Sequence, residues 1–223
     1  MPREPGAEVL VLAAFDPELA PLKGILGDGL DARVGGRRIA ARTVGVGLAA
    51  AAAGASRWIG ELAPRAVVLV GSCGAYAGAA LAIGDVVLGG RLSLADLAAV
   101  DGLAAFPPPM ALVMETEGRL SDAITRASGG VRRAPVATTL AITTDDAAAA
   151  RIAHGGAEVE HLETHGVAAA CAGREVPFAV VLGVANAVGS RGRAEWLANH
   201  LRAEAAACAV VAAWIQRGAP LEP

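Results

Sequence analysis

Lysine, cysteine and aromatic residues are all scarce in this chain of 223 residues. Lys23 is the one lysine among 19 basic residues, and the formal net charge is −3. No basic surface is therefore expected to hold a phosphate backbone, which argues against nucleic acid as a partner. Three cysteines, Cys73, Cys171 and Cys208, lie far apart and form no CxxC pair. They predict no disulfide framework and fit a protein of the reducing cytoplasm.

Long hydrophobic runs without polar interruption are also missing. The longest uncharged stretch covers residues 66–84, but it contains Gly71, Ser72, Gly74 and Tyr76, and no cluster of basic residues flanks it to set an orientation. Near the N-terminus the apolar run is short and ends before Asp16, without the cationic region and cleavage site of a signal peptide. We expect neither a membrane-spanning helix nor a secretory signal.

Apolar residues make up 54% of the chain, and 28 residues are glycines. A composition this apolar excludes a disordered chain. The length allows one sizeable core and is short for two. We therefore expect a single domain over residues 1–223.

Short apolar runs alternate with helical patterns along the whole chain. This alternation predicts an α/β fold around a mainly parallel sheet, because strands buried on both faces read as continuous apolar runs. The expected strands cover residues 9–14, 38–44, 66–70, 83–89, 134–138 and 178–184. The expected helices cover residues 16–26, 48–62, 117–127, 145–153, 163–173 and 193–216. The segment 91–109 is expected to be a loop with a short helix.

Two local motifs have an obvious interpretation that we do not favour. The run Gly45-Val46-Gly47-Leu48-Ala49-Ala50 matches the dinucleotide pattern G-x-G-x-x-A, but no acidic residue ends the next strand to bind a ribose. His161 and His165 have the i, i+4 spacing of metal ligands on a helix, but no third ligand stands out. We interpret the two histidines as partly exposed polar positions at a helix start. No metal and no cofactor are expected.

Four polar residues share a position relative to the expected strands. Glu18, Ser72, Glu163 and Asn186 each follow a strand at its carboxyl end or open the next helix. Each has an ordinary explanation, as a turn residue or as a carboxylate in the first turn of a helix. Parallel strands would nevertheless bring these ends together, at the edge where open α/β sheets bind ligands.

Several segments together resemble the nucleoside phosphorylase/nucleosidase superfamily. They occur in suitable order and spacing over nearly the whole chain: Ala14-Phe15-Asp16-Pro17-Glu18-Leu19, Val70-Gly71-Ser72-Cys73-Gly74, Gly84-Asp85-Val86-Val87, Leu162-Glu163, and Val176-Pro177-Phe178 leading to Asn186. The tail from Asn186 to Trp196 is most similar to the futalosine hydrolase branch. The resemblance implies a three-layer α/β/α domain, a purine nucleoside as substrate, and a homodimer or larger homo-oligomer.

The resemblance also implies roles for particular residues in cleaving a ribose–purine bond. Glu18 would position or deprotonate a water, and Asn186 would contact the purine edge; these two are the expected catalytic residues. Glu163 would bind the ribose hydroxyls and Ser72 would contact the nucleophile. The expected substrate-binding residues are Phe15, Ser72, Cys73, Gly74, Ile142, Thr143, Leu162 and Glu163.

Two departures from other branches of the superfamily favour a particular reaction. Leu19 and Leu69 stand where phosphorylases carry phosphate-binding arginines, so water is favoured over phosphate as the nucleophile. Asn186 stands where adenine-specific nucleosidases use an aspartic acid that protonates N7. An amide can instead donate to a 6-oxo group and accept from N7–H, which suits hypoxanthine or guanine.

The sequence therefore favours a hydrolase of 6-oxopurine nucleosides, with futalosine as the expected substrate and a place in menaquinone synthesis. Three alternatives stay open. They are a methylthioadenosine/S-adenosylhomocysteine nucleosidase, a phosphate-dependent purine nucleoside phosphorylase, and a nucleoside-binding module that has lost turnover.

Overall fold

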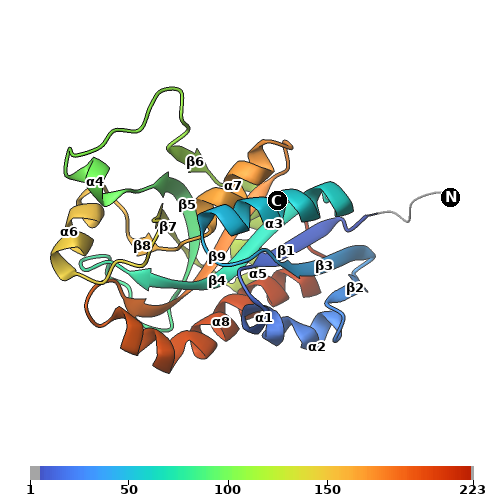
Figure 1. Cartoon of the computed structure of the whole chain (residues 1–223). Helices are drawn as coiled ribbons and strands as arrows, with labels where there is room; N and C mark the ends of the chain where they lie inside the picture. Colours follow the sequence, from blue (N-terminus) through green and yellow to red (C-terminus); the bar gives the residue numbers. More distant parts are fainter. Residues whose placement is uncertain (1–5, 222–223) are drawn as a thin grey trace.

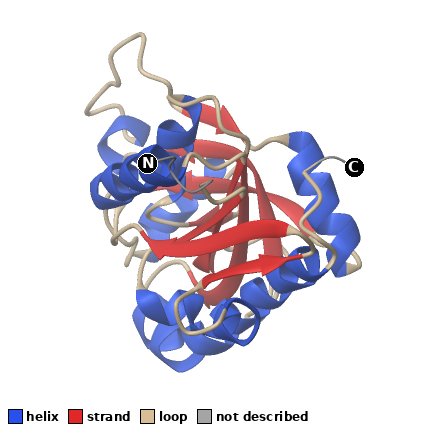
Figure 2. Ribbon diagram, turned by 90° about the vertical axis from the view of Figure 1, so that its right-hand side faces the viewer, coloured by secondary structure: helices blue, strands red, loops and turns tan. Residues whose placement is uncertain are grey.

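The computed structural model describes residues 6–221 and confirms the α/β fold, with a central sheet covered by helices on both faces (Figures 1 and 2). The expected domain of residues 1–223 includes residues 1–5 and 222–223, which lie outside the described part. The strands are β1 (Val9–Ala13), β2 (Asp31–Val34), β3 (Arg37–Thr43), β4 (Ala66–Ala75), β5 (Val86–Leu94), β6 (Val113–Glu115), β7 (Arg132–Thr138), β8 (Val159–Glu160) and β9 (Phe178–Ala187). The helices are α1 (Asp16–Leu19), η1 (Ala20–Leu22), α2 (Lys23–Leu26), α3 (Leu48–Leu62), α4 (Leu97–Val100), α5 (Gly118–Ser128), α6 (Asp146–His154), α7 (Thr164–Ala172) and α8 (Gly192–Gln216).

The sheet is mixed, and part of it closes on itself. The strands follow the order β2-β3-β1-β4-β8-β7-β5-β6, and β9 pairs with both β4 and β5. Strands β4, β8, β7, β5 and β9 therefore form a closed ring. Strands β3, β1, β4 and β9 run parallel to one another, so their carboxyl ends lie at the same edge.

Two hydrophobic layers cover the faces of the sheet. Helices α3 and α7 pack together on one face, where Ala55 and Val167 belong to one core. On the other face α8 lies against β4 and β9 and contacts α5 and the α1–α2 segment (Figure 1). There Leu22, Ile124 and Trp214 belong to a second core and are fully buried. These layers fix α1 and α7 at the edge where the parallel strands end.

The expected helix over residues 16–26 is wrong as a single helix. It consists of α1, the 3-10 turn η1 and α2. Pro21 explains the break, because proline has no N–H to continue the α-helical hydrogen bonds. Asp16 is the first helical residue, whereas the N-cap position falls on Phe15 without a side-chain cap. The short α1 leaves Glu18 at the point where the chain turns away from β1.

The expected end of the strand over residues 66–70 is also wrong. Strand β4 continues through Gly71, Ser72, Cys73 and Gly74 to Ala75, and β9 pairs with it along this length, with a register shift between Cys73 and Gly74. The parallel partner supplies the backbone hydrogen bonds that the glycines alone would not favour. The short strands β2, β6 and β8 were not predicted either. The helices over 48–62 and 193–216 are confirmed to within one residue.

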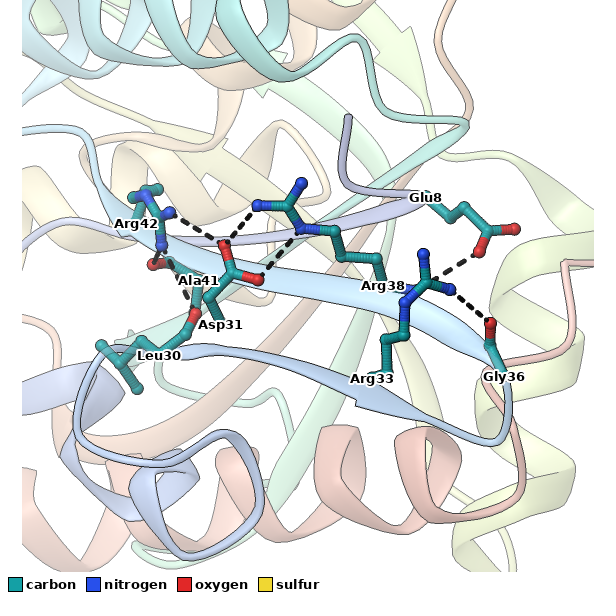
Figure 3. Close-up of polar contacts among 8 residues, drawn as sticks. All are labelled: Glu8, Leu30, Asp31, Arg33, Gly36, Arg38, Ala41 and Arg42. Carbon is teal, nitrogen blue, oxygen red and sulfur yellow. Dashed lines mark hydrogen bonds and ion pairs between the residues drawn. The ribbon is translucent and has the colours of Figure 1, made fainter. Parts of the chain in front are cut away.

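Charged side chains hold the edge strand β2 to β3. Asp31 on β2 forms ion pairs with Arg38 and Arg42 on β3, at 3.2 and 3.3 Å (Figure 3). Arg33 donates to the carbonyl of Gly36 in the turn between the two strands. Charge along an edge strand disfavours pairing with further strands. These arginines are thus engaged at the sheet edge and do not line the cavity described below.

The helices of residues 6–221 include no candidate for a membrane span. None of them is both long enough and apolar enough to cross a bilayer.

Candidate active site

A cavity of about 380 Å³ lies at the carboxyl ends of β1, β4 and β9, between α1 and the start of α8. It brings together residues that are far apart in the sequence. All ten residues expected at the site line it, from Phe15 in the first loop to Asn186 on β9. The ten are Phe15, Glu18, Ser72, Cys73, Gly74, Ile142, Thr143, Leu162, Glu163 and Asn186. Their roles stay predictions.

Glu18 is buried, and backbone amides hold both of its oxygens. The N–H of Ala14 donates to Oε2 at 2.8 Å and the N–H of Ser72 donates to Oε1 at 3.1 Å. Burial raises the pKa of Glu18 to about 8, against the two backbone hydrogen bonds that lower it and with smaller contributions from Glu163 and Glu204. The carboxyl group therefore titrates close to neutral pH, which is the range of a general acid or base.

Gly71 gives the Glu18 carboxylate its space. A methyl group on Gly71 would lie 2.9 Å from Glu18 Oε1 and 3.1 Å from His161 Nε2. Glu18 and His161 thus both lie close to Gly71 on β4, where the strand has no side chain. A side chain at residue 71 would displace one of them, which explains a glycine inside this strand.

Glu163 is held from two sides in a similar way. The N–H of Gly47, at the start of α3, donates to Oε1 at 2.7 Å. His161 Nε2 lies 3.2 Å from Oε2, and His161 Nδ1 lies 2.8 Å from Thr164 Oγ1. Burial lowers the pKa of His161 despite the opposing effect of Glu163, so the imidazole is neutral at pH 7. A neutral ring that accepts from Thr164 has its Nε2–H free to donate to Glu163.

These contacts correct our interpretation of the two histidines and refine that of the glycine turn. His161 precedes α7, so the pair does not share a helix face, and both histidines are buried, not partly exposed. Within residues 6–221 no group of His, Cys, Asp and Glu could hold a metal ion. In the Gly45-Val46-Gly47 turn, the amide at the helix start binds the Glu163 carboxylate, a use that helix N-termini favour for any anion.

Asn186 lies beside Gly74 on the neighbouring strand. A methyl group on Gly74 would be 2.9 Å from Asn186 Nδ2, so this glycine also makes room for a side chain of the cavity. Asn186 Nδ2 donates to the carbonyl of Ala187 at 2.7 Å, and Glu195 in turn accepts from the N–H of Ala187. One amide hydrogen and the amide oxygen of Asn186 stay available to a ligand.

Several cavity residues were not anticipated from the sequence. Trp196 donates from Nε1 to Ser72 Oγ at 3.2 Å and stacks on His200, and the Arg193 guanidinium also lies over the Trp196 ring. Glu160 accepts from Tyr76 and Thr143. Trp196 belongs to the segment that carries the resemblance and could have been included on that ground. Glu160 lies on β8, a strand of two residues that leaves no periodic signal.

Comparisons with known proteins concern the family and the fold of the chain. The family model described as the phosphorylase superfamily matches residues 27–216, whereas a search of curated proteins finds no significant match. Among solved structures, a Neisseria meningitidis 5′-methylthioadenosine/S-adenosylhomocysteine nucleosidase is 21% identical, with a TM-score of 0.82 over 94% of this chain and 98% of that one.

Two structures from Helicobacter pylori are similar to a comparable degree. A futalosine hydrolase is 17% identical, with a TM-score of 0.83 over 94% of this chain and 97% of that one. A 5′-methylthioadenosine/S-adenosylhomocysteine nucleosidase is 16% identical, with a TM-score of 0.84 over 96% of this chain and 100% of that one. At this identity the likeness concerns the fold. The family model, which matches more than half of the chain, shows that the chain belongs to the phosphorylase superfamily.

Proposed function

We propose that this protein is a nucleosidase that hydrolyses the N-glycosidic bond of 6-oxopurine ribonucleosides. The observation that carries the proposal is the single cavity lined by Glu18, Glu163 and Asn186. Two buried carboxylates at one part of this cavity suit a sugar that becomes cationic as the bond breaks. An amide at another part suits an oxopurine leaving group.

Water is the nucleophile that the surroundings favour. Leu19 and Leu69, where the resemblance to phosphorylases would require arginines, are fully buried in the core. The amide of Gly47, an obvious anion donor, is occupied by Glu163. Arg193 lines the cavity, but it lies over Trp196 and is exposed. A phosphate dianion would need several cationic or amide donors, and the amides of Gly47 and Ser72 are already occupied by Glu163 and Glu18.

In the proposed reaction the bond from C1′ to N9 breaks and the oxygen of water bonds to C1′. Glu163 accepts hydrogen bonds from the ribose hydroxyls and stabilises the sugar as positive charge develops. Glu18, in its ionised form, takes a proton from the attacking water. The electron pair of the broken bond leaves with the purine. The free amide hydrogen of Asn186 donates to O6, where part of that negative charge collects.

Futalosine is the 6-oxopurine nucleoside that we favour, with hypoxanthine as the released base. Support comes from Asn186 and from the similarity of the tail after it to the futalosine hydrolase branch. The H. pylori futalosine hydrolase and the methylthioadenosine/S-adenosylhomocysteine nucleosidases resemble the fold equally well. The choice between them therefore depends on the base-binding residues of this chain.

We further propose a homodimer or larger homo-oligomer in the cytoplasm. Val46 and Ile142 line the cavity and are 63% and 54% exposed, and Leu140, two residues before Ile142, is 71% exposed. Exposed large apolar side chains at the rim of a site are typical of an interface, here with another copy of the chain. The three cysteines are free thiols, as expected in a reducing compartment. Light scattering on a size-exclusion column tests the assembly, and a monomer at micromolar concentration would contradict it.

The decisive experiment measures free base released from futalosine, inosine and methylthioadenosine, with and without phosphate. We expect hypoxanthine from futalosine at a rate that does not depend on phosphate. Release that requires phosphate would contradict hydrolysis, and faster release of adenine would favour the methylthioadenosine nucleosidase. Tight nucleoside binding without release from any substrate would indicate a binding module.

A further inference from the structure

A series of side chains on α8 leads from the cavity to the backbone of Glu18. Trp196, His200, Glu204 and Cys208 follow one another at four-residue spacing, so neighbours in this series lie on the same side of the helix. Trp196 lines the cavity at one end. At the other end, where α8 packs against α1 (Figure 1), the thiol of Cys208 donates to the carbonyl oxygen of Glu18 at 3.1 Å. Glu204 thus lies one helical turn from the contact with Glu18.

Glu204 is a buried carboxylate that is only half satisfied. Its exposed fraction is 1%. His200 Nδ1 lies 2.9 Å from Oε1, whereas Oε2 has no hydrogen-bond partner in the part of the chain that the structure describes. Burying an incompletely paired carboxylate is costly, and an apolar side chain of similar size would avoid that cost. A carboxyl group kept in such a place is a candidate for an electrostatic role.

Titratable groups face Glu18 from two neighbouring elements. They are His161 and Glu163 from the segment between β8 and α7, and Glu204 and Cys208 from α8. Burial keeps two of them uncharged, because it lowers the pKa of His161 and raises the pKa of the Cys208 thiol to about 12. Among these groups the remaining charges belong to Glu163 and Glu204. Both add to the rise that burial causes in the pKa of Glu18.

The carboxylate of the His200–Glu204 pair lies closer to Glu18 than the imidazole does. His200 is one turn farther from Cys208, about 6 Å along the helix axis from Glu204. Its side chain is 17% exposed, against 1% for that of Glu204, so water screens a charge on the imidazole more strongly. In either protonation state of His200, Glu18 is therefore next to the negative end of the pair.

We propose that Glu204 is a positioning residue that acts through Glu18: its negative charge, supported by His200, makes the Glu18 carboxylate a stronger base toward the attacking water. The inference rests on the proposed function and deepens it, because it names a group that sets the proton affinity of the base. A nearby negative charge favours the protonated form of a carboxyl group. The ionised Glu18 therefore takes a proton from water more readily.

An alternative explanation is that Glu204 only anchors α8 through its contact with His200. The two explanations differ in what they predict for the pH dependence of the reaction. Loss of an anchor lowers the stability of the protein and reduces kcat/KM to a similar extent at every pH. Loss of a charge beside Glu18 moves the pH at which Glu18 becomes ionised, and with it the acidic limb of kcat/KM.

The test measures kcat/KM for the preferred nucleoside from pH 5 to 10 with wild-type protein, Glu204→Gln and Glu204→Asp. In the wild type the acidic limb should lie near the pKa of Glu18, at about 8. Glu204→Gln should move the limb to lower pH by about half a unit or more. Glu204→Asp keeps the charge and should restore most of this shift. The dissociation constant of a nucleoside analogue should change little, because Glu204 lies outside the lining of the cavity.

Two further variants separate charge from packing. Cys208→Ala removes a side chain that contacts Glu18 but changes no charge, so it should lower stability and leave the limb in place. His200→Leu takes away the partner of the Glu204 carboxylate, and a buried carboxyl group without a partner favours its protonated form. This variant should therefore move the limb in the same direction as Glu204→Gln. A limb that Glu204→Gln leaves unmoved, or that Cys208→Ala moves as far, would overturn the inference.

A second measurement needs no turnover. Infrared difference spectra recorded over the same pH range follow the protonated carboxyl group of Glu18, which Glu18→Gln identifies by its absence. The titration midpoint of this group should be lower in Glu204→Gln than in wild type, and an equal midpoint would contradict the proposal. A protein that shows the shift but cleaves no nucleoside would refute the proposed function and still support the control of Glu18 by Glu204.

Discussion

The two ends of the cavity are built differently. At the end with Glu18 and Glu163, backbone amides of Ala14, Ser72 and Gly47 hold the carboxylates. At the end with Asn186, the side-chain hydroxyls of Tyr76 and Thr143 supply two of the three hydrogen bonds to Glu160, and the N–H of Thr143 supplies the third. Backbone donors come with the fold, whereas side-chain donors change with single substitutions. The first end is therefore suited to chemistry common to the superfamily, and the second to the choice of base.

The largest expected effect concerns Glu18. Glu18→Gln should lower kcat for the preferred nucleoside by about 10³-fold, in the range of a lost general base, while the dissociation constant of a nucleoside analogue changes little. Steady-state kinetics and calorimetry measure the two quantities. Asp16→Asn is the matched control, because Asp16 is an exposed carboxylate in the same turn. Equal loss of binding and turnover in Glu18→Gln would contradict the assigned role.

At the other end of the cavity, Asn186→Asp should shift the preference toward adenine. A protonated aspartic acid can donate to N7, whereas an ionised one repels O6 of hypoxanthine. The ratio of kcat/KM for inosine to that for adenosine should fall by about tenfold or more, and most strongly at low pH. Competition assays over pH 5 to 8 give this ratio. An unchanged ratio would remove Asn186 from base recognition.

His161 offers a way to test whether Glu163 binds the ribose hydroxyls. His161→Phe removes the contact with Glu163 Oε2 and should lower kcat/KM for a ribonucleoside by roughly tenfold, as expected for a lost hydrogen bond to a charged group. The loss should largely disappear with the 2′-deoxynucleoside, which lacks a hydroxyl that Glu163 would bind. His154→Phe, at an exposed position in α6, controls for the substitution. Equal losses with both sugars would point to a merely structural role.

The smallest effect is on stability and follows from the raised pKa of Glu18. The folded protein holds this proton up to about pH 8, whereas the unfolded chain releases it near the ordinary value of 4.5. Stability should therefore fall as the pH rises from about 4.5 to 8. Glu18→Gln should be more stable than wild type by about 1–3 kcal/mol at pH 8 and no more stable at pH 4. Urea unfolding at the two pH values measures this difference, and one that did not grow with pH would contradict the shift.

Sequence reasoning found residues at both ends of the cavity but missed Glu160 and His161. Strand ends, helix starts and the family resemblance are enough to place Glu18 and Glu163 at one edge. The position of Glu160 depends on β8, which exists only because β4 and β7 pair with it. His161 likewise contacts Glu163 only because of the turn before α7. Neither feature has a local pattern, because each depends on partners distant in the sequence.

The same reason separates the predictable and unpredictable parts of the fold. Long helices such as α3 and α8 end at clear local signals, and their bounds follow from the sequence. Gly71 and Gly74 look like a strand end when considered alone. They lie inside β4 because β9 runs beside them, and because Glu18, His161 and Asn186 need the space that their missing side chains leave.

The closed ring of β4, β8, β7, β5 and β9 has a mechanical consequence. A strand paired on both flanks cannot slide or peel away without breaking hydrogen bonds to two neighbours at once. The positions of Gly74 and Asn186, which pair with each other within this ring, therefore resist displacement. Changes in what the cavity accommodates can arise more easily at the loop residues that line it, such as Val46 and Ile142, than at these two positions.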